Sequence, residues 1–216
     1  MKLKFLFISL DNLSADLAWQ VSKEGHEVKY HVQNKGDRDV ADGFVEKINS
    51  YKEYIDWADV IVFDDVLGHG GTAQELRSKG KLVLGGTSYT DMLEDDRSFG
   101  QEELKRFGIE ILPYKDFRSF DEAIKFVKDN PKSYVIKPTA ETPPSTKGLL
   151  FIGEEKDGAD VIQVLNDYKE SWADSIPAFQ LQEKVNGIEI AVGAFFNGKE
   201  FMNPININFE HKKLFP

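Results

Sequence analysis

Two lysines bracket a long loop in the second half of the chain, and their types and spacing could do chemistry. Lys137 ends a short apolar run, and Lys147 precedes a second run that ends at Ile152. The ten residues from Pro138 to Lys147 exceed a hairpin loop of about 2 to 5 residues. Two ammonium groups at the mouth of a sheet would suit a polyphosphate, because each donates charge-assisted hydrogen bonds to phosphoryl oxygens. Alternatively, each lysine is a solvated residue at a strand end.

Arg97 is a third cation, in an unusual place. Asp96 is a good N-cap and Gly108 a good C-cap, so the sequence predicts a helix between them. A cation in the first turn opposes the helix macrodipole, at a cost of about a few tenths of a kcal/mol unless an anion compensates it. That anion is either the carboxylate of Asp95 or Asp96, or the phosphate of a ligand.

Two acids lie beside a predicted hairpin. Asn186-Gly187 and Asn197-Gly198 are both hairpin signals, and they predict strands near 178–185, 188–196 and 199–208. If Val185 pairs with Ile188, Glu183 lies on an otherwise apolar face. A carboxylate there needs hydrogen-bond donors, and the exocyclic amine of an adenine is one candidate.

Glu189 falls on the opposite face of the same predicted hairpin. Ala191 and Gly193 share that face, and their small side chains leave space beside the carboxylate. The alternative is an ion pair with Lys184 directly across the hairpin, worth only about 0.2 to 1 kcal/mol.

A glycine-rich stretch ends at Gly70 and Gly71, directly before a predicted helix. Their backbone amides could converge on an anion, or the glycines could serve only the turn. Just before this stretch, Asp64-Asp65 could hold a magnesium ion or be a solvated strand end. The loop after the first predicted strand lacks Gly-x-Gly-x-x-Gly, so the dinucleotide fingerprint is absent.

Composition narrows the class of protein. The 216 residues carry 27 Lys and Arg against 37 Asp and Glu, a formal charge of -10, so we expect no nucleic-acid partner. Cysteine is absent, which excludes disulfides and thiolate metal sites and fits a reducing cytoplasm. The first ten residues are neither a signal peptide nor long enough to cross a bilayer, so we expect no membrane partner. The oligomeric state cannot be predicted.

The two halves of the chain show different patterns. In residues 1–87, apolar strands at Leu3–Ile8, His26–Val32, Val60–Phe63 and Leu82–Leu84 alternate with helical segments. This order predicts a small doubly wound α/β domain with a parallel sheet, whose ligands should bind at the carboxyl ends of its strands. Residues 88–216 combine helices near 119–129 and 159–168 with antiparallel strands, which predicts an α+β region.

Several motifs taken together resemble one family. They are, in order, Leu93-Glu-Asp-Asp-Arg-Ser-Phe, Gly108-Ile, Val135-Ile-Lys-Pro, Lys147-Gly, Leu181-Gln-Glu-Lys-Val-Asn-Gly-Ile-Glu and Asn208-Phe-Glu-His-Lys-Lys. Each motif is short, but their order and spacing resemble the ATP-grasp ligases, particularly the phosphoribosylamine-glycine ligases of purine biosynthesis. The resemblance spans nearly the whole chain.

This resemblance implies a role for each matching residue. Arg97 and Lys137 would hold ATP phosphates, and Lys147 would belong to a mobile loop that closes over them. The residues meeting the adenine edge would be Gln182, Glu183 and Val185, and Glu189 would meet the ribose hydroxyls. The segment leading to the acceptor site would be Glu210, His211 and Lys212. Independently of the resemblance, the backbone amides of Gly70 and Gly71 are candidates for binding a substrate anion.

The activity implied is that of an ATP- and Mg²⁺-dependent carboxylate-amine ligase working through an acyl phosphate. The alternative is a non-catalytic ATP-binding or regulatory module with the same fold. Three features depart from the family: Pro143-Pro144 in the loop, Ser9–Ser14 in place of a glycine-rich turn, and an end at Pro216 before the expected magnesium ligands. We therefore expect the metal ligands beyond residue 216, and weak ATP binding with negligible turnover from these 216 residues.

Overall fold

The computed structural model describes residues 1–64, 68–139, 150–172 and 175–210. The chain forms two compact units, Met1–Ile111 and Leu112–Pro216. The division falls later than the boundary predicted after residue 87, because two helices that follow the first sheet pack within the first unit. Within the described ranges, no helix is long and apolar enough to cross a membrane.

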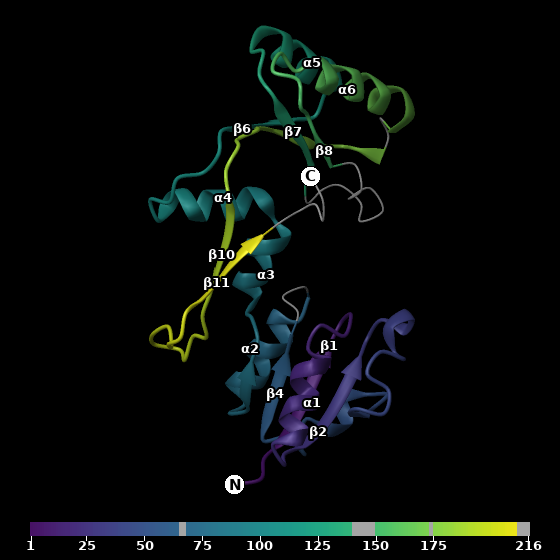
Figure 1. The fold of residues 1–216 in the computed structure, drawn as a ribbon, viewed down its shortest axis with the longest axis vertical. Coiled ribbons are helices and arrows are strands. Elements are labelled where there is room, and N and C mark those ends of the chain that lie inside the picture. Colours follow the sequence, from purple (N-terminus) through teal and green to yellow (C-terminus); the bar gives the residue numbers. More distant parts are fainter. Residues whose placement is uncertain (65–67, 140–149, 173–174, 211–216) are drawn as a thin grey trace. The chain divides into compact units, whose positions relative to one another are not determined.

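The first unit contains the predicted parallel sheet (Figure 1). Its strand order is β3-β2-β1-β4-β5, with every neighbouring pair parallel. The strands are β1 (Lys4–Ser9), β2 (Glu27–Val32), β3 (Glu46–Lys47), β4 (Val60–Phe63) and β5 (Leu82–Leu84). The four predicted strands are confirmed, and only the two-residue β3 was not predicted.

Helices cover the parallel sheet because its central strands are apolar on both faces. Leu6 and Ile61 pack on one face with Ala73 of α2, and Phe7 and Tyr30 pack on the other face in the cluster that includes Ala18 of α1. The helices of this unit are α1 (Ala15–Lys23), α2 (Gly70–Ser78), α3 (Ser88–Asp95) and α4 (Arg97–Arg106), with short 3-10 turns η1 (Lys35–Asp37) and η2 (Tyr51–Tyr54).

The second unit contains a four-stranded antiparallel sheet in the order β6-β9-β7-β8. Its strands are β6 (Tyr114–Phe117), β7 (Tyr134–Pro138), β8 (Phe151–Ile152) and β9 (Phe179–Glu183). Helices α5 (Phe120–Asp129) and α6 (Ala159–Trp172) pack together and against this sheet (Figure 1). The predicted α+β character of this region is confirmed.

The hairpin predicted at Asn186-Gly187 is wrong. β9 pairs with β6 on one edge and β7 on the other, so it has no free edge for the strand that follows. That strand, β10 (Glu189–Gly193), instead pairs antiparallel with β11 (Asn206–Glu210) in a separate two-stranded sheet. The Asn197-Gly198 signal does mark a turn between them, flanked by a bridge from Phe196 to Phe201.

Candidate functional site

One face of the four-stranded sheet is polar. Side chains alternate between the two faces of a strand, and Phe179 and Leu181 of β9 point into the core that α5 and α6 cover. Gln180 and Gln182 therefore lie on the other face, yet both are buried, with relative exposures of 0% and 8%. Buried amides need hydrogen-bond partners. This face is where a polar ligand would find groups already held in place.

Lys137 lies in the same polar row. The register places Asp116 of β6 and Lys137 of β7 on either side of Gln180. Gln180 Nε2 donates to Asp116 Oδ1 at 3.0 Å, and Lys137 Nζ donates to Oε1 of Gln182. The structure thus brings together Lys137 and Gln182, two of the predicted nucleotide-binding residues. Asp116 and Gln180 were not predicted, although the alternation of residues 179–183 was a usable signal for them.

Glu183 lies on the opposite face from Gln182. Its register partner on β7 is Tyr134, and its carboxylate forms an ion pair with Lys132. The hydrogen bond to Glu183 raises the pKa of Lys132, and burial together with the nearby Glu183 charge raises the pKa of the Tyr134 hydroxyl. The expectation that Glu183 shares the apolar face of β9 is confirmed, and a lysine supplies the donor it needs. Its contact with adenine stays a prediction.

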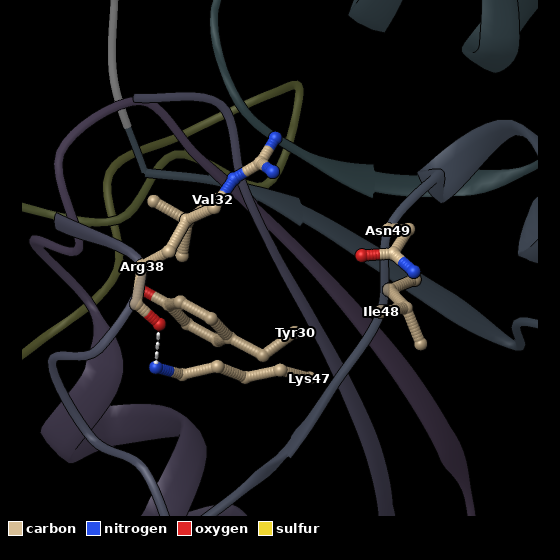
Figure 2. A pocket seen from close by; sticks show the side chains of 6 residues that line it. All are labelled: Tyr30, Val32, Arg38, Lys47, Ile48 and Asn49. Carbon is tan, nitrogen blue, oxygen red and sulfur yellow. Dashed lines mark hydrogen bonds between the residues drawn. The ribbon is translucent and has the colours of Figure 1, made fainter. Parts of the chain in front are cut away.

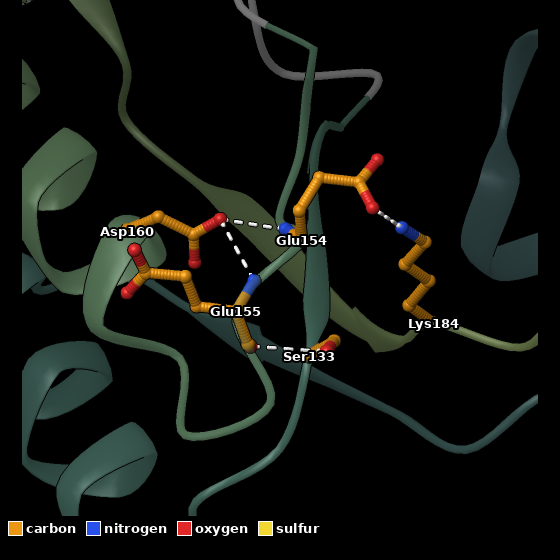
Figure 3. Close-up of polar contacts among 5 residues, drawn as sticks. All are labelled: Ser133, Glu154, Glu155, Asp160 and Lys184. Carbon is orange, nitrogen blue, oxygen red and sulfur yellow. Dashed lines mark hydrogen bonds and ion pairs between the residues drawn. The ribbon is translucent and has the colours of Figure 1, made fainter. Parts of the chain in front are cut away.

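Polar contacts tie together the strand ends away from Lys137 (Figure 3). Asp160 Oδ2 accepts from the backbone N–H groups of Glu154 at 2.6 Å and Glu155 at 3.2 Å. Ser133 Oγ donates to the carbonyl of Glu155 at 3.0 Å, and Lys184 pairs with Glu154 at 2.5 Å. These contacts link the residues that flank β7, β8 and β9, at the end of β7 opposite to Lys137. The hairpin register that would place Lys184 directly across from Glu189 does not form, because β10 pairs with β11 instead.

Glu189 and Glu210 face each other across the β10–β11 ladder. Both are exposed at the end of the two-stranded sheet, and neither belongs to the sheet that carries Lys137. Val185 is also exposed, in the segment between β9 and β10. The roles predicted for these three residues at ribose, acceptor and adenine stay predictions.

Arg97 begins α4 in the first unit and is exposed. Asp96 caps the helix, accepting from Phe99 N at 3.0 Å, as predicted. Among the residues that the structure describes, no ion pair links Arg97 to Asp95 or Asp96. The Asp96 carboxylate nevertheless lies at the N-terminus of α4, where the simpler alternative places the compensating anion. A contact of Arg97 with a phosphate stays a prediction.

The start of α2 has an anion of its own. Gly70 N donates to Asp91 Oδ2 at 2.9 Å, and a Cβ on Gly70 would stand 2.2 Å from the Thr87 carbonyl oxygen. Glycine is therefore required here by the close approach of α3. Gly71 has the Ser88 hydroxyl oxygen 3.4 Å from an added Cβ. Binding of a substrate by Gly70 and Gly71 stays a prediction.

Asp64, at this edge, uses one carboxylate oxygen, Oδ2, while Oδ1 is buried without a hydrogen-bond partner in the described structure. Asp64 accepts from the backbone N–H of Ser14 at 2.9 Å and from its hydroxyl at 2.5 Å. Across the described part of the chain, no group of three or more His, Cys, Asp or Glu side chains is placed to hold a metal ion. Three predicted site residues, Lys147, His211 and Lys212, lie outside the described residues.

No family model matches the chain. Over 146 residues it is 27% identical to the phosphoribosylamine--glycine ligase of Methanoregula boonei, and equally identical to that of Methanocella arvoryzae. These alignments cover 67% of this chain but 32% of each relative, so the chain spans about a third of their length.

Solved structures similar to this chain show which fold it has. An N5-carboxyaminoimidazole synthetase from Staphylococcus aureus, complexed with ADP, matches 98% of this chain with a TM-score of 0.65 and 18% identity. The chain has the ATP-grasp fold. The phosphoribosylamine--glycine ligase of Thermotoga maritima matches 94% of the chain with a TM-score of 0.61 and 18% identity. The chain covers 56% and 49% of these two ATP-grasp proteins, about half of each. The predicted resemblance is thereby confirmed in sequence and in fold.

Proposed function

We propose that this ATP-grasp chain binds ATP through its second unit and serves in the ATP-dependent joining of a carboxylate to an amine. The observation that carries this proposal is the polar sheet face, where buried Gln182 holds the ammonium of Lys137. A lysine ammonium that is held in place on a partly buried sheet face suits phosphoryl oxygens. The sequence similarity to phosphoribosylamine--glycine ligases and the ADP complex of a protein with this fold support the choice of nucleotide.

The reaction would take place in two steps. ATP would supply a phosphoryl group to the carboxylate, giving an acyl phosphate and ADP, and the amine would then displace phosphate to give an amide. Lys137 would position the phosphates and offset the negative charge that develops during transfer. On the resemblance alone, Lys147 and also Arg97, which belongs to the first unit, are proposed as further phosphate contacts. Mg²⁺ is proposed on the resemblance alone, because the described residues provide no cluster of ligands for it.

The substrates are proposed as a small carboxylate and a small amine. The relatives' name points to glycine and phosphoribosylamine as the first pair to test. Two features of the first unit favour a different amine: Ser9–Ser14 replace the glycine-rich turn, and the α2 amide of Gly70 is occupied by Asp91. A cytoplasmic location would agree with small-molecule biosynthesis.

Two assays test this function. Titration calorimetry with ATP should give saturable binding to the 216-residue chain, and absence of binding would contradict the proposal. Phosphate release from Mg²⁺-ATP, with glycine as carboxylate and hydroxylamine as trap, would report an acyl phosphate as a hydroxamate. Release that depends on both additions identifies a ligase, and it would overturn our expectation of negligible turnover. ATP binding without phosphate release is the outcome that we expect from these 216 residues.

A further inference from the structure

A cavity lies at the carboxyl ends of β2 and β3 in the first unit (Figure 2). It measures about 120 Å³ and is lined by Tyr30, Val32, Arg38, Lys47, Ile48 and Asn49. A single water needs roughly 10 to 15 Å³ of this kind of space. The cavity therefore has room for a ligand of several non-hydrogen atoms.

Donors that the chain does not use surround this cavity. Among the described residues, neither the guanidinium of Arg38 nor the side-chain amide of Asn49 has a hydrogen-bond or ion-pair partner. Lys47 donates to the backbone carbonyl of Arg38 and to Asp42 Oδ1 at 2.7 Å. These bonds take two of the three N–H donors of an ammonium. A guanidinium, an amide and the third ammonium hydrogen therefore remain for a ligand.

The positive charges beside the cavity favour an anionic ligand. In a chain with a formal charge of -10, two cationic side chains line one small cavity. Asp37 and Asp39 flank Arg38 in sequence, but neither forms an ion pair with it in the described structure. The planar fork of an arginine suits two oxygens of one anion. Arg38 is thus left available beside acids that could have neutralised it.

The cavity also differs in position from the crevice expected for substrates. Ligands of open α/β sheets bind where neighbouring strands send their connections in opposite directions, which in this sheet is between β1 and β4. The cavity lies at β2 and β3, on the far side of β1 from β4. It is also in the other unit from Lys137 and Gln182. Whatever it binds need not be the nucleotide.

We propose that this cavity binds a small molecule through an oxyanion, a phosphate or a carboxylate group, held by Arg38, Lys47 and Asn49. The apolar lining supplied by Val32, Ile48 and the Tyr30 ring contacts the organic part of the ligand. The stem of Lys47 contributes to the same wall, since long cationic side chains pack their methylene groups while the charge stays accessible. This site is independent of the function proposed for the second unit.

Titration calorimetry of the 216-residue protein tests the proposal with inorganic phosphate and acetate as separate probes. We expect saturable binding of at least one probe, and weakening of about tenfold or more in Arg38→Ala. Asn49→Ala should also weaken binding, and its exposed side chain makes it a safe second variant for folding. Lys79→Ala is the matched control, because it removes one exposed positive charge at the C-terminal end of α2, and Lys79 does not line the cavity.

The outcomes separate cleanly. Stronger binding of phosphate assigns a phosphate group, and stronger binding of acetate assigns a carboxylate. Binding that Arg38→Ala and Lys79→Ala weaken equally would reduce the effect to net charge and overturn the proposal. Failure of both probes to bind saturably would overturn it as well. Circular dichroism of each variant establishes that the fold is retained, and ATP affinity is expected to stay unchanged in all of them.

Discussion

Lys137 Nζ donates a hydrogen bond to Oε1 of Gln182 on the neighbouring strand. Gln180 lies directly opposite Lys137, so this bond runs diagonally along one face of the sheet. Gln182 carries no charge and therefore positions the ammonium without neutralising it. The hydrogen bond joins a buried amide to the lysine that we propose binds phosphate, so changing Gln182 should alter the affinity for ATP.

The first prediction concerns this pair. Gln182→Met removes the acceptor while keeping a side chain of similar length, so ATP binding should weaken by a few-fold. Because the two residues act together, the double variant with Lys137→Ala should lose less than the sum of the single losses, with a coupling of about 0.5 to 3 kcal/mol. ATP affinities of the four proteins measure this coupling. Strictly additive losses would mean that Gln182 does not position Lys137 for the ligand.

A second prediction concerns Glu183. If its carboxylate accepts a hydrogen bond from the adenine amine, Glu183→Gln should weaken the binding of both ATP and adenosine by about 1 to 3 kcal/mol. Lys132→Met is the matched control, because it removes the ion-pair partner and leaves the carboxylate. Adenosine affinity that is unchanged in Glu183→Gln, or lowered equally in Lys132→Met, would leave Glu183 as the ion-pair partner of Lys132.

The third prediction concerns acid stability and Asp160. Burial raises the pKa of this carboxyl, but backbone N–H bonds, including those from Glu154 and Glu155, outweigh it and hold the pKa below the ordinary value of 3.8. The ionised form is thus favoured in the folded state, so its stabilisation is complete above about pH 3.8 and is lost as the pH falls through the lowered value. Asp160→Asn should cost about 1 kcal/mol at pH 7, because hydrogen bonds to a charged group are replaced by bonds to a neutral amide.

Urea denaturation at several pH values checks this expectation. The difference in unfolding free energy between the natural protein and Asp160→Asn should be constant near neutrality and shrink in acid. Asp167→Asn, which changes an exposed acid on the same helix, should leave the profile unchanged. A difference that does not vary with pH would show that the charge of Asp160 contributes nothing.

A fourth prediction concerns His31 in the first unit. Burial lowers the pKa of this imidazole below 6.5. The hydrogen bond with the Ile48 carbonyl opposes this shift, and the positive charge of Arg38 adds to it. Only the unfolded chain then takes up the proton readily, so stability should fall as the pH drops below about 6.5 and level off beneath the folded pKa. His31→Gln should flatten this part of the profile. Flattening by His69→Gln instead would assign the effect to the other histidine.

The sequence predicted correctly those strands that are marked by a short apolar run next to a turn residue. The strand predicted at Leu3–Ile8 corresponds to β1 at Lys4–Ser9, and the strand predicted at Leu82–Leu84 to β5 with the same bounds. Each is a short apolar run next to a turn residue, which is a strand signal for a central strand such as β1 and for an edge strand such as β5. The end of β7 at Pro138 likewise places Lys137 where the sequence predicted it.

Pairing partners depend on distant residues and could not be predicted. Asn186-Gly187 is a strong local turn signal, but β6 and β7 occupy both edges of β9. The burial of Gln180 and Gln182 was missed for the same reason: alternation separates the two faces of β9 but does not show that the amides on its polar face are buried. The ion pair of Glu183 with Lys132 joins residues 51 positions apart.

The comparison of ATP with adenosine in Lys137→Ala tests the central claim most directly. Adenosine has no phosphates, so the account predicts a loss of about ten- to a hundredfold in ATP affinity, with adenosine affinity unchanged. Lys128→Ala, which removes an exposed lysine of α5, should change neither affinity. Equal weakening of both ligands in Lys137→Ala would indicate general damage to the sheet, and unchanged ATP affinity would contradict the assignment of Lys137 as a phosphate ligand.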